Sequence, residues 1–205
     1  MGRSYLVDTL LVKNGTVAFK TNGSKILGAG NTSYANLTTE AVVVMDGALV
    51  GGTAVQDCTI SIEIDMQNGD RTAILGDGCL NCTFTKNKIY GFTNSATENH
   101  RGIRLQEGSS GNKIYDNDIT GVSSPTQRGL LVELWASLTG LTDFGGFFQG
   151  TIVHQPTPAL NNIVTGNTLT GGSYALNLQG GEYNTFSDNV CINQNHRSIW
   201  MGPGS

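Results

Sequence analysis

Charged residues are scarce in this chain: Asp, Glu, Lys and Arg make up 14% of it, and the net charge is −4. This small negative charge argues against nucleic acid as the main partner. Long apolar runs are also missing, because apolar and polar residues are interleaved, and so no membrane span is expected. The first residues hold no apolar stretch of the signal-peptide kind, so release from a cell would need lysis or a removed leader.

Helical periodicity is almost absent, whereas glycine accounts for 28 of the 205 residues. Asn, Thr and Ser are frequent as well. This composition suits a fold with many turns and polar strand surfaces. The length is sufficient for one domain with a sizeable core.

One short pattern occurs four times: an apolar residue, two further residues, Asn, any residue, and a second apolar residue. Its central asparagines are Asn87, Asn117, Asn167 and Asn189. Self-similarity at intervals of about 20 to 50 residues indicates a solenoid, and strand-length segments with period-two alternation indicate a β-solenoid. Asn suits a bend between two short strands and tolerates left-handed dihedral angles. Stacked asparagines can also hydrogen-bond one another as a ladder.

A second repeat precedes each copy of the first and in most cases begins with Arg. Its copies align without gaps at residues 71–77, 101–107, 128–134, 174–180 and 197–203. One repeat therefore contains an Arg-led strand, a Gly-rich turn, a strand, an Asn turn and a third strand. The sequence predicts an all-β fold, a single-stranded right-handed parallel β-helix with three strands per rung and about seven rungs.

The chain is predicted to form one domain over residues 1–205. Residues 1–57 are expected to form irregular first rungs and residues 58–205 regular ones. An insertion at 136–160 is expected to lie on one face, often the binding face of a solenoid. Residues 201–205 align with 105–109, after which the earlier rung continues. We therefore expect a fragment of a longer chain, or an end that another chain covers.

Alternation predicts which side chains point inward. In residues 60–66 these are Ile60, Ile62, Ile64 and Met66. In the Arg-led strands the expected inward residues are Ala73, Leu75, Ile103, Leu105, Leu130, Val132, Leu176, Leu178, Ile199 and Met201. One expected outward column contains Ile74, Arg104, Leu131, Asn177 and Trp200. The next contains Gly76, Gln106, Glu133, Gln179 and Gly202.

These outward columns form a polar and aromatic strip of the kind that glycans use. Aromatic rings cover the apolar faces of sugars, while amides and carboxylates bond to hydroxyl groups. The candidate substrate-binding residues are Arg104, Gln106, Trp135, Asn177, Gln179, Trp200 and His154. The alternative is an ordinary exposed strand face.

Cleavage of a glycosidic bond requires two carboxyl groups, one as acid and one as nucleophile or base. Glu133 is the leading candidate because it lies between Gln106 and Gln179 in the alignment and precedes the insertion. The candidate catalytic residues are Glu133, Glu107, Asp77 and Asp143. Asp77 and Glu107 align on neighbouring rungs, where mutual repulsion would raise one pKa as a general acid requires. The alternative interpretation of these carboxylates is a solvated turn.

A lyase would instead need a base beside a uronic carboxylate and a cation to hold that carboxylate. The candidates for these roles are His154, Arg104 and Lys86. The Arg column that begins at Arg71 and Arg101 has two interpretations, turn capping and contact with an anionic glycan.

The four cysteines, Cys58, Cys79, Cys82 and Cys191, have no convincing metal-site spacing. We expect reduced, buried thiols, with a zinc or redox site at the CxxC of Cys79 and Cys82 as the alternative. No metal and no cofactor are predicted.

The Asn-turn repeat, the Arg-led strands and the Ile60–Met66 strand resemble the pectate-lyase-like β-helix superfamily. Within it, the chain looks most like the β-helix of a bacteriophage tailspike or polysaccharide depolymerase. The resemblance implies a homotrimer, located in the virion or outside the cell, that binds a bacterial capsule or O-antigen polysaccharide and cleaves it by hydrolysis. A non-catalytic glycan-binding or structural spike, and a secreted uronate lyase or epimerase, remain as alternatives.

Overall fold

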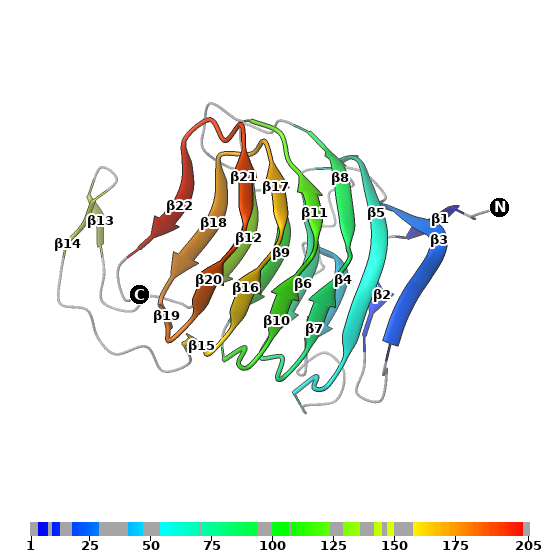
Figure 1. The fold of residues 1–205 in the computed structure, drawn as a ribbon, viewed down its shortest axis with the longest axis horizontal. Helices are drawn as coiled ribbons and strands as arrows, with labels where there is room; N and C mark the ends of the chain where they lie inside the picture. Colours follow the sequence, from blue (N-terminus) through cyan, green and yellow to red (C-terminus); the bar gives the residue numbers. More distant parts are fainter. Residues whose placement is uncertain are drawn as a thin grey trace.

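The computed structural model describes residues 4–7, 10–12, 18–28, 41–46, 54–69, 71–93, 100–106, 108–123, 129–135, 142–144, 147–149 and 158–202. These residues form β-strands and turns, and no helix occurs among them. Two candidate site residues, Glu107 and His154, lie outside the described residues. The strands lie side by side along one long axis, with the two ends of the chain at opposite ends of the stack (Figure 1).

One parallel sheet contains seven strands in the order β2-β4-β6-β9-β12-β18-β22. Neighbours in the sheet are far apart in the sequence, so the chain leaves the sheet and returns to it each time. The strands are β2 (Leu10–Leu11), β4 (Ala41–Asp46), β6 (Thr72–Asp77), β9 (His100–Gln106), β12 (Gly129–Trp135), β18 (Tyr174–Gln179) and β22 (Arg197–Met201).

A second parallel sheet contains eleven strands, with a path of β20-β16-β10-β7-β5-β8-β11-β17-β21. The long strand β5 pairs with both β7 and β8 and so joins the two halves of this path. β3 pairs with β5, and β1 pairs with β3. The strands are β1 (Ser4–Val7), β3 (Ala18–Gly28), β5 (Thr59–Gly69), β7 (Thr83–Thr85), β8 (Lys88–Phe92), β10 (Lys113–Tyr115), β11 (Asp118–Thr120), β16 (Ile163–Thr165), β17 (Thr168–Thr170), β20 (Thr185–Ser187) and β21 (Val190–Ile192).

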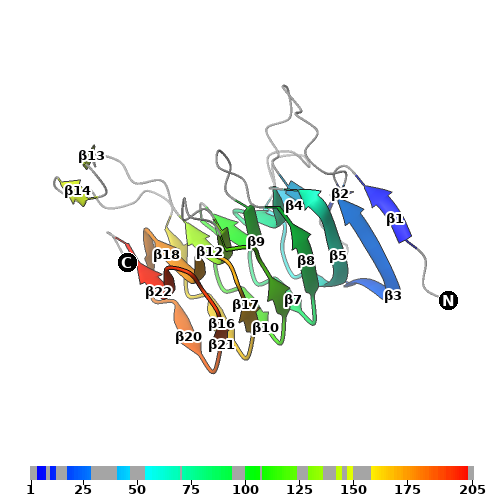
Figure 2. The ribbon, with the colours of Figure 1, turned by 90° about the horizontal axis from the view of Figure 1, so that it is seen from above.

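Two small pairs complete the described strands. β15 (Ala159–Leu160) and β19 (Gly181–Glu182) are parallel, whereas β13 (Thr142–Phe144) and β14 (Phe147–Gln149) form an antiparallel hairpin. The hairpin belongs to the predicted insertion and stands apart from the stacked strands in Figures 1 and 2. The expectation that the insertion lies on the binding face therefore gains no support from its described part.

The chain is thus all-β with long parallel sheets, as predicted, and this arrangement is compatible with a parallel β-helix. Figure 2, seen from above, shows the two large sheets as separate layers whose strands run across the long axis. Apolar side chains fill the space between the layers as one continuous cluster. Strand β5 has the predicted alternation, since Ile60, Ile62, Ile64 and Met66 are all buried in that cluster.

The predicted asparagine ladder is present at the bends of the eleven-stranded sheet. Asn87 Nδ2 donates to Asn117 Oδ1 at 2.8 Å, Asn117 Nδ2 to Asn167 Oδ1 at 2.8 Å, and Asn167 Nδ2 to Asn189 Oδ1 at 2.8 Å. The same Oδ1 atoms also accept backbone N–H groups of the preceding asparagine. The left-handed dihedral angles fall on the residue before each asparagine (Lys86, Asp116, Gly166 and Asp188) and not on the asparagine itself.

A second ladder was not predicted. Asn112 Nδ2 donates to Asn162 Oδ1 at 2.9 Å, and Asn162 Nδ2 donates to Asn184 Oδ1 at 3.0 Å. Cys82 occupies the preceding position, where its backbone N–H donates to Asn112 Oδ1 at 2.8 Å. Two stacked rows of side-chain amides therefore hydrogen-bond to backbone groups at two successive bends. Buried backbone groups without such partners would be costly there.

The predicted register of the Arg-led strands is wrong at two places. In β6, Ile74 pairs with Ile103 and Leu75 with Arg104, so Ile74 is buried in the core and Leu75 is partly exposed. A slip of one residue moves each side chain to the opposite face of a sheet. The predicted alignment of Asp77 with Glu107 is also wrong, because Asp77 pairs with Gln106.

In β12 the observed pairing with the neighbouring strands is shifted by two residues from the predicted pairing. Glu133 pairs with Arg104 on one side and with Asn177 on the other, instead of with Gln106 and Gln179. Leu131, predicted to point outward, belongs to the core cluster, whereas Leu130 does not. Leu131 enters the core because the alternation breaks, since these strands place two successive residues in the core: Ala73 and Ile74, Leu131 and Val132, Ala175 and Leu176. The register differs because Leu130, and not the first residue of the 128–134 repeat, pairs with Arg101.

The last strand, β22, differs from the others in burial. Ile199 and Met201, predicted to point inward, are 51% and 60% exposed. β22 pairs with β18 on one side only and ends the order of the seven-stranded sheet.

Candidate functional site

The face of the seven-stranded sheet that points away from the core brings most of the predicted site residues together. Two rows cross the sheet at the spacing of parallel strands, about 4.8 Å, the first over β6, β9, β12, β18 and β22 and the second over β6, β9, β12 and β18. The first row contains Leu75, Arg104, Glu133, Asn177 and Trp200. The second row contains Asp77, Gln106, Trp135 and Gln179. Eight of the predicted site residues therefore share one face.

Glu133 is the centre of this face. Its Oε2 lies 2.6 Å from the Nε of Arg101 and 3.3 Å from the Nε of Arg104, and its Oε1 accepts a hydrogen bond of 2.9 Å from Asn177 Nδ2. The glutamate is only 3% exposed. A buried carboxylate needs such partners, because an unpaired buried charge is very costly. The contacts come from the two strands on either side of β12, so the register of the sheet builds the cluster.

Arg104 also covers an aromatic ring. Its guanidinium carbon lies 4.5 Å from the centre of the Trp135 ring. A cation–π contact of this kind contributes about 0.5 to 2 kcal/mol. It links the two rows and fixes the plane of the guanidinium.

Asp77 has a separate partner within the second row. Gln106 Nε2 donates to Asp77 Oδ2 at 2.6 Å. Asp77 and Glu133 lie two strands apart and on different rows, so their Cα atoms are about 12 Å apart. On the other side of Asp77, Asp46 of β4 holds the paired position in the register, a neighbour that the sequence alignment missed.

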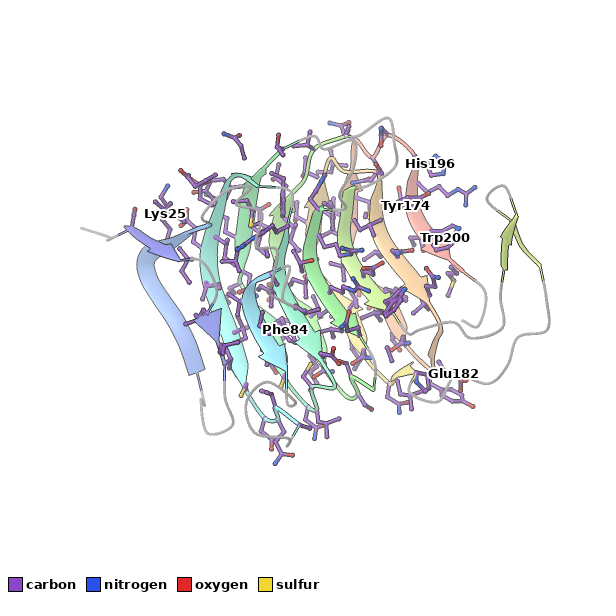
Figure 3. The ribbon with its side chains drawn as sticks, turned by 180° about the vertical axis from the view of Figure 1, so that it is seen from behind. Lys25, Phe84, Tyr174, Glu182, His196 and Trp200 are labelled. Atoms are coloured by element: carbon purple, nitrogen blue, oxygen red, sulfur yellow. The ribbon has the colours of Figure 1, made fainter. Side chains whose placement is uncertain are left out.

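An aromatic group lies at the end of the same face. The ring of Tyr174 is 5.0 Å from that of His196, edge-on, and 6.1 Å from that of Trp200. Figure 3 shows Tyr174, His196 and Trp200 together at the end of the sheet formed by β18 and β22. Trp200 was predicted as a binding residue, whereas Tyr174 and His196 were not. The sequence signal for Tyr174 is that it stands where most of the other repeats have their leading Arg.

The remaining predicted residues are not brought to this face by the described structure. Asp143 lies in β13, for which only the backbone is described, and Glu107 and His154 fall outside the described residues. Arg101 was noted in the sequence only as a member of the Arg column, yet it makes the shortest contact to Glu133. The Asn-His-Arg sequence at 99–101 carried no indication of that partner.

The cysteines are reduced and form no disulfide. Burial, assisted by Cys82, raises the pKa of Cys58 to about 11. The hydrogen bond between the thiols of Cys79 and Cys82 raises the pKa of Cys79 and lowers that of Cys82. Within the described part of the chain, no three His, Cys, Asp or Glu side chains cluster in a way that could hold a metal ion.

The described residues also contain no helix that is long and apolar enough to cross a membrane. Comparison of the chain with known proteins gave no match to a family model, to a curated protein or to a solved structure. The functional argument therefore depends on the face itself. Its carboxylate, guanidinium, amide and indole groups at sugar-sized spacing are suited to binding a polymer rich in hydroxyl groups.

Proposed function

We propose that this chain is a tailspike-type domain that binds a bacterial surface polysaccharide, a capsule or O-antigen, and cleaves it by hydrolysis. The proposal includes the fold in its finer form, a right-handed parallel β-helix of the pectate-lyase-like superfamily with three strands per rung and about seven rungs. It also includes a homotrimer, in the virion or outside the cell. The resemblance of the repeats supports these parts.

The observation that carries the proposal is the cluster around Glu133. Arg101, Arg104 and Asn177 converge on one nearly buried carboxylate, with Trp135 packed beside it. A rigid sheet holds the whole group, and rigid elements position binding groups better than loops do. Aromatic rings on both rows supply surfaces for sugar rings.

For hydrolysis, we assign Glu133 the part of carboxylate base and Asp77 that of acid. Glu133 lies against two guanidinium groups, and Asp77, which accepts a hydrogen bond from Gln106, is a carboxylate of the second row.

A second candidate function is glycan binding without cleavage. It is favoured by the burial of Glu133 and by the occupation of both its oxygens, since a general base needs access to water. In this case the cluster would position the binding groups and the domain would act in receptor recognition.

The test is the release of reducing ends from a panel of purified capsules and O-antigens. The variants are Glu133→Gln and Asp77→Asn, with Asp118→Asn, an exposed carboxylate of the other sheet, as matched control. Hydrolysis predicts release by the wild type and the control, a large loss in both site variants, and no ultraviolet absorbance of unsaturated uronates. Release with that absorbance would indicate a lyase. Binding without release would indicate the second candidate function, and no binding at all would contradict both.

A further inference from the structure

We propose that Asn177 and Trp200 bind an N-acetyl group of the glycan, so that the ligand is a polysaccharide that contains an N-acetylated amino sugar. In this arrangement the amide N–H of the sugar donates to Asn177 Oδ1, and the acetyl methyl group packs against the ring of Trp200. The inference depends on the proposed function, glycan binding at the outer face of the seven-stranded sheet, and it narrows the class of polymer.

A buried acceptor on Asn177 is the first argument. The residue is only 4% exposed. Its Nδ2 donates to Glu133 Oε1 at 2.9 Å, whereas its Oδ1 is buried and accepts no hydrogen bond within the described part of the chain. Native structures rarely leave a buried acceptor without a partner, because such a group is costly. A donor on a ligand would give this oxygen its partner.

The orientation of the amide places the acceptor on the side of β22. Nδ2 and Oδ1 diverge from one carbon atom, and Nδ2 points to Glu133 on β12, so Oδ1 faces away from β12. On its other side Asn177 pairs with Trp200, at the spacing of parallel strands, about 4.8 Å. A ligand reaches the oxygen when the half-buried ring of Trp200 turns aside. β22 permits this movement because, among the described strands, it pairs with β18 alone.

The bond to Glu133 also makes Asn177 a stronger acceptor. Hydrogen bonds in a chain polarise one another, and the effect is larger where water is excluded. Donation from Nδ2 to the carboxylate therefore increases the negative charge on Oδ1. The direction of this acceptor is fixed, since the same bond holds the amide in place. A rigid amide N–H on the sugar suits it well.

An aromatic surface beside Asn177 favours an acetamido group over a hydroxyl group. The ring of Trp200 lies 6.1 Å from that of Tyr174, which lies 5.0 Å from that of His196, and Figure 3 shows the three together. Aromatic rings bind apolar groups of a ligand. A hydroxyl group would donate to Oδ1 but would bring no apolar group to the rings. An acetamido group is planar and carries both an N–H and a methyl group.

The first experiment compares three methyl glycosides by NMR titration: those of N-acetylglucosamine, 2-O-acetylglucose and glucose. The 2-O-acetyl compound has nearly the same shape as the N-acetyl compound but carries an ester oxygen in place of the N–H. We expect the N-acetyl compound to bind at least about fivefold more tightly than either of the others. Equal affinity for the N-acetyl and O-acetyl compounds, or no binding of the N-acetyl compound, would overturn the inference without reference to any variant.

The same titration locates the sugar. The chain has two tryptophans, so the indole N–H signal of Trp200 is the one that disappears in Trp200→Phe. We expect the N-acetyl compound to shift this signal more than that of Trp135. A shift confined to Trp135 would place the sugar elsewhere on the face and would overturn the inference.

Two variants and a control test the roles of the side chains. Asn177→Ala removes the acceptor, so the N-acetyl and O-acetyl compounds should bind it about equally. Trp200→Ala should weaken binding of the N-acetyl compound about fivefold or more. Tyr183→Ala, which removes an exposed ring between β19 and β20, should leave that binding unchanged. Unchanged affinity in Trp200→Ala would overturn the inference, as would a retained preference in folded Asn177→Ala. If Asn177→Ala does not fold, Trp200→Ala and the wild-type comparison decide.

The second experiment separates this inference from the proposed function. A bacterial polysaccharide that binds and contains N-acetyl groups is compared with its N-deacetylated form and with the same sample after chemical re-acetylation. We expect binding to be lost and then restored. Equal binding of all three forms would overturn this inference and leave the proposed function intact. If the N-acetyl glycoside binds with the expected preference but no polysaccharide in the panel binds, the subsite stands and the proposed function fails.

Discussion

Arg101 and Glu133 lie on neighbouring strands of the seven-stranded sheet, with Nε of the arginine 2.6 Å from Oε2 of the glutamate. Neither residue is more than 9% exposed. A change at either position therefore affects a buried charge. Stability measurements can test this relationship without knowledge of any ligand.

Replacement of Glu133 by Ala should lower the free energy of unfolding by about 3 to 5 kcal/mol, because it leaves two guanidinium groups without their shared carboxylate. Glu133→Gln should cost less, since an amide still accepts a hydrogen bond. Urea denaturation provides the measurement. The exposed control Asp118→Ala should stay within about 0.5 kcal/mol of the wild type. Equal stability of Glu133→Ala and the control would contradict the structure of the cluster.

Replacement of Asn117 by Ala should be among the most destabilising single changes in the eleven-stranded sheet. Its side chain accepts two hydrogen bonds from Asn87 and donates to Phe84 O and Asn167 Oδ1. Each buried group left without a partner costs about 1 to 3 kcal/mol, so we expect a loss of about 3 kcal/mol or more.

The matched control for the ladder is Asn189→Ala. Asn189 is the last residue of the same ladder and is only partly buried. The same truncation should therefore cost clearly less there. Equal losses at the two positions would show that the ladder does not act through buried, mutually bonded amides.

The reactivity of the cysteine thiols tests whether the core is packed as described. Cys58, Cys79 and Cys82 are buried, whereas Cys191 is partly exposed. With an aromatic disulfide reagent at neutral pH, we expect only Cys191 to react in the native protein, and slowly, because burial raises its pKa. All four thiols should react after denaturation. The Cys191→Ser variant should be unreactive when folded, and fast modification of any thiol in that variant would contradict the packing.

The ion pair between Lys25 and Asp65, 3.1 Å in length, should make a small pH-dependent contribution to stability. Burial alone would raise the pKa of Asp65, but hydrogen bonds from Gln67 and Lys25 outweigh it and lower the pKa. A carboxylate with a lowered pKa stabilises the fold above its unfolded value of about 3.9 and loses this effect as the pH falls through the folded pKa.

The corresponding measurement is thermal unfolding of Asp65→Asn and the wild type over a range of pH. The variant should melt at a slightly lower temperature at about pH 6, and the difference should vanish well below about pH 3.9. A difference that grows as the pH falls would have the wrong sign and would refute this assignment.

The sequence predicts the parts of the fold that depend on local repetition. The Asn turns recur with the same flanking apolar residues, so the ladder of Asn87, Asn117 and Asn167 follows from the repeat itself. The second ladder was not predicted although the repeat contains it, because Asn112, Asn162 and Asn184 each stand five residues before a central asparagine and only Cys82 departs from the column.

The site is predicted less well, and the reason is register. The choice of Glu133 as an outward residue is correct, but its predicted neighbours are wrong, because the repeat aligns residues 71–77 and 128–134 with 101–107 on their leading arginines. In the sheet, Thr72 and Leu130 are the residues that pair with Arg101. A shift of two residues leaves a side chain on the same face of the sheet but changes the residues beside it. The repeat alignment therefore predicts Gln106 and Gln179 beside Glu133, whereas Arg104 and Asn177 lie there. Pairing between strands is a non-local property that a single sequence determines only weakly.

Tryptophan fluorescence during a glycan titration tests the central claim most directly. The chain has two tryptophans, Trp135 and Trp200, and both lie on the rows that cross the proposed binding face. The account predicts a saturable change in emission with a bacterial polysaccharide, reduced in Trp135→Phe and retained in a control such as Tyr115→Phe on the other sheet. Binding of the same polysaccharide by calorimetry with no change in emission would place the ligand elsewhere and contradict the account.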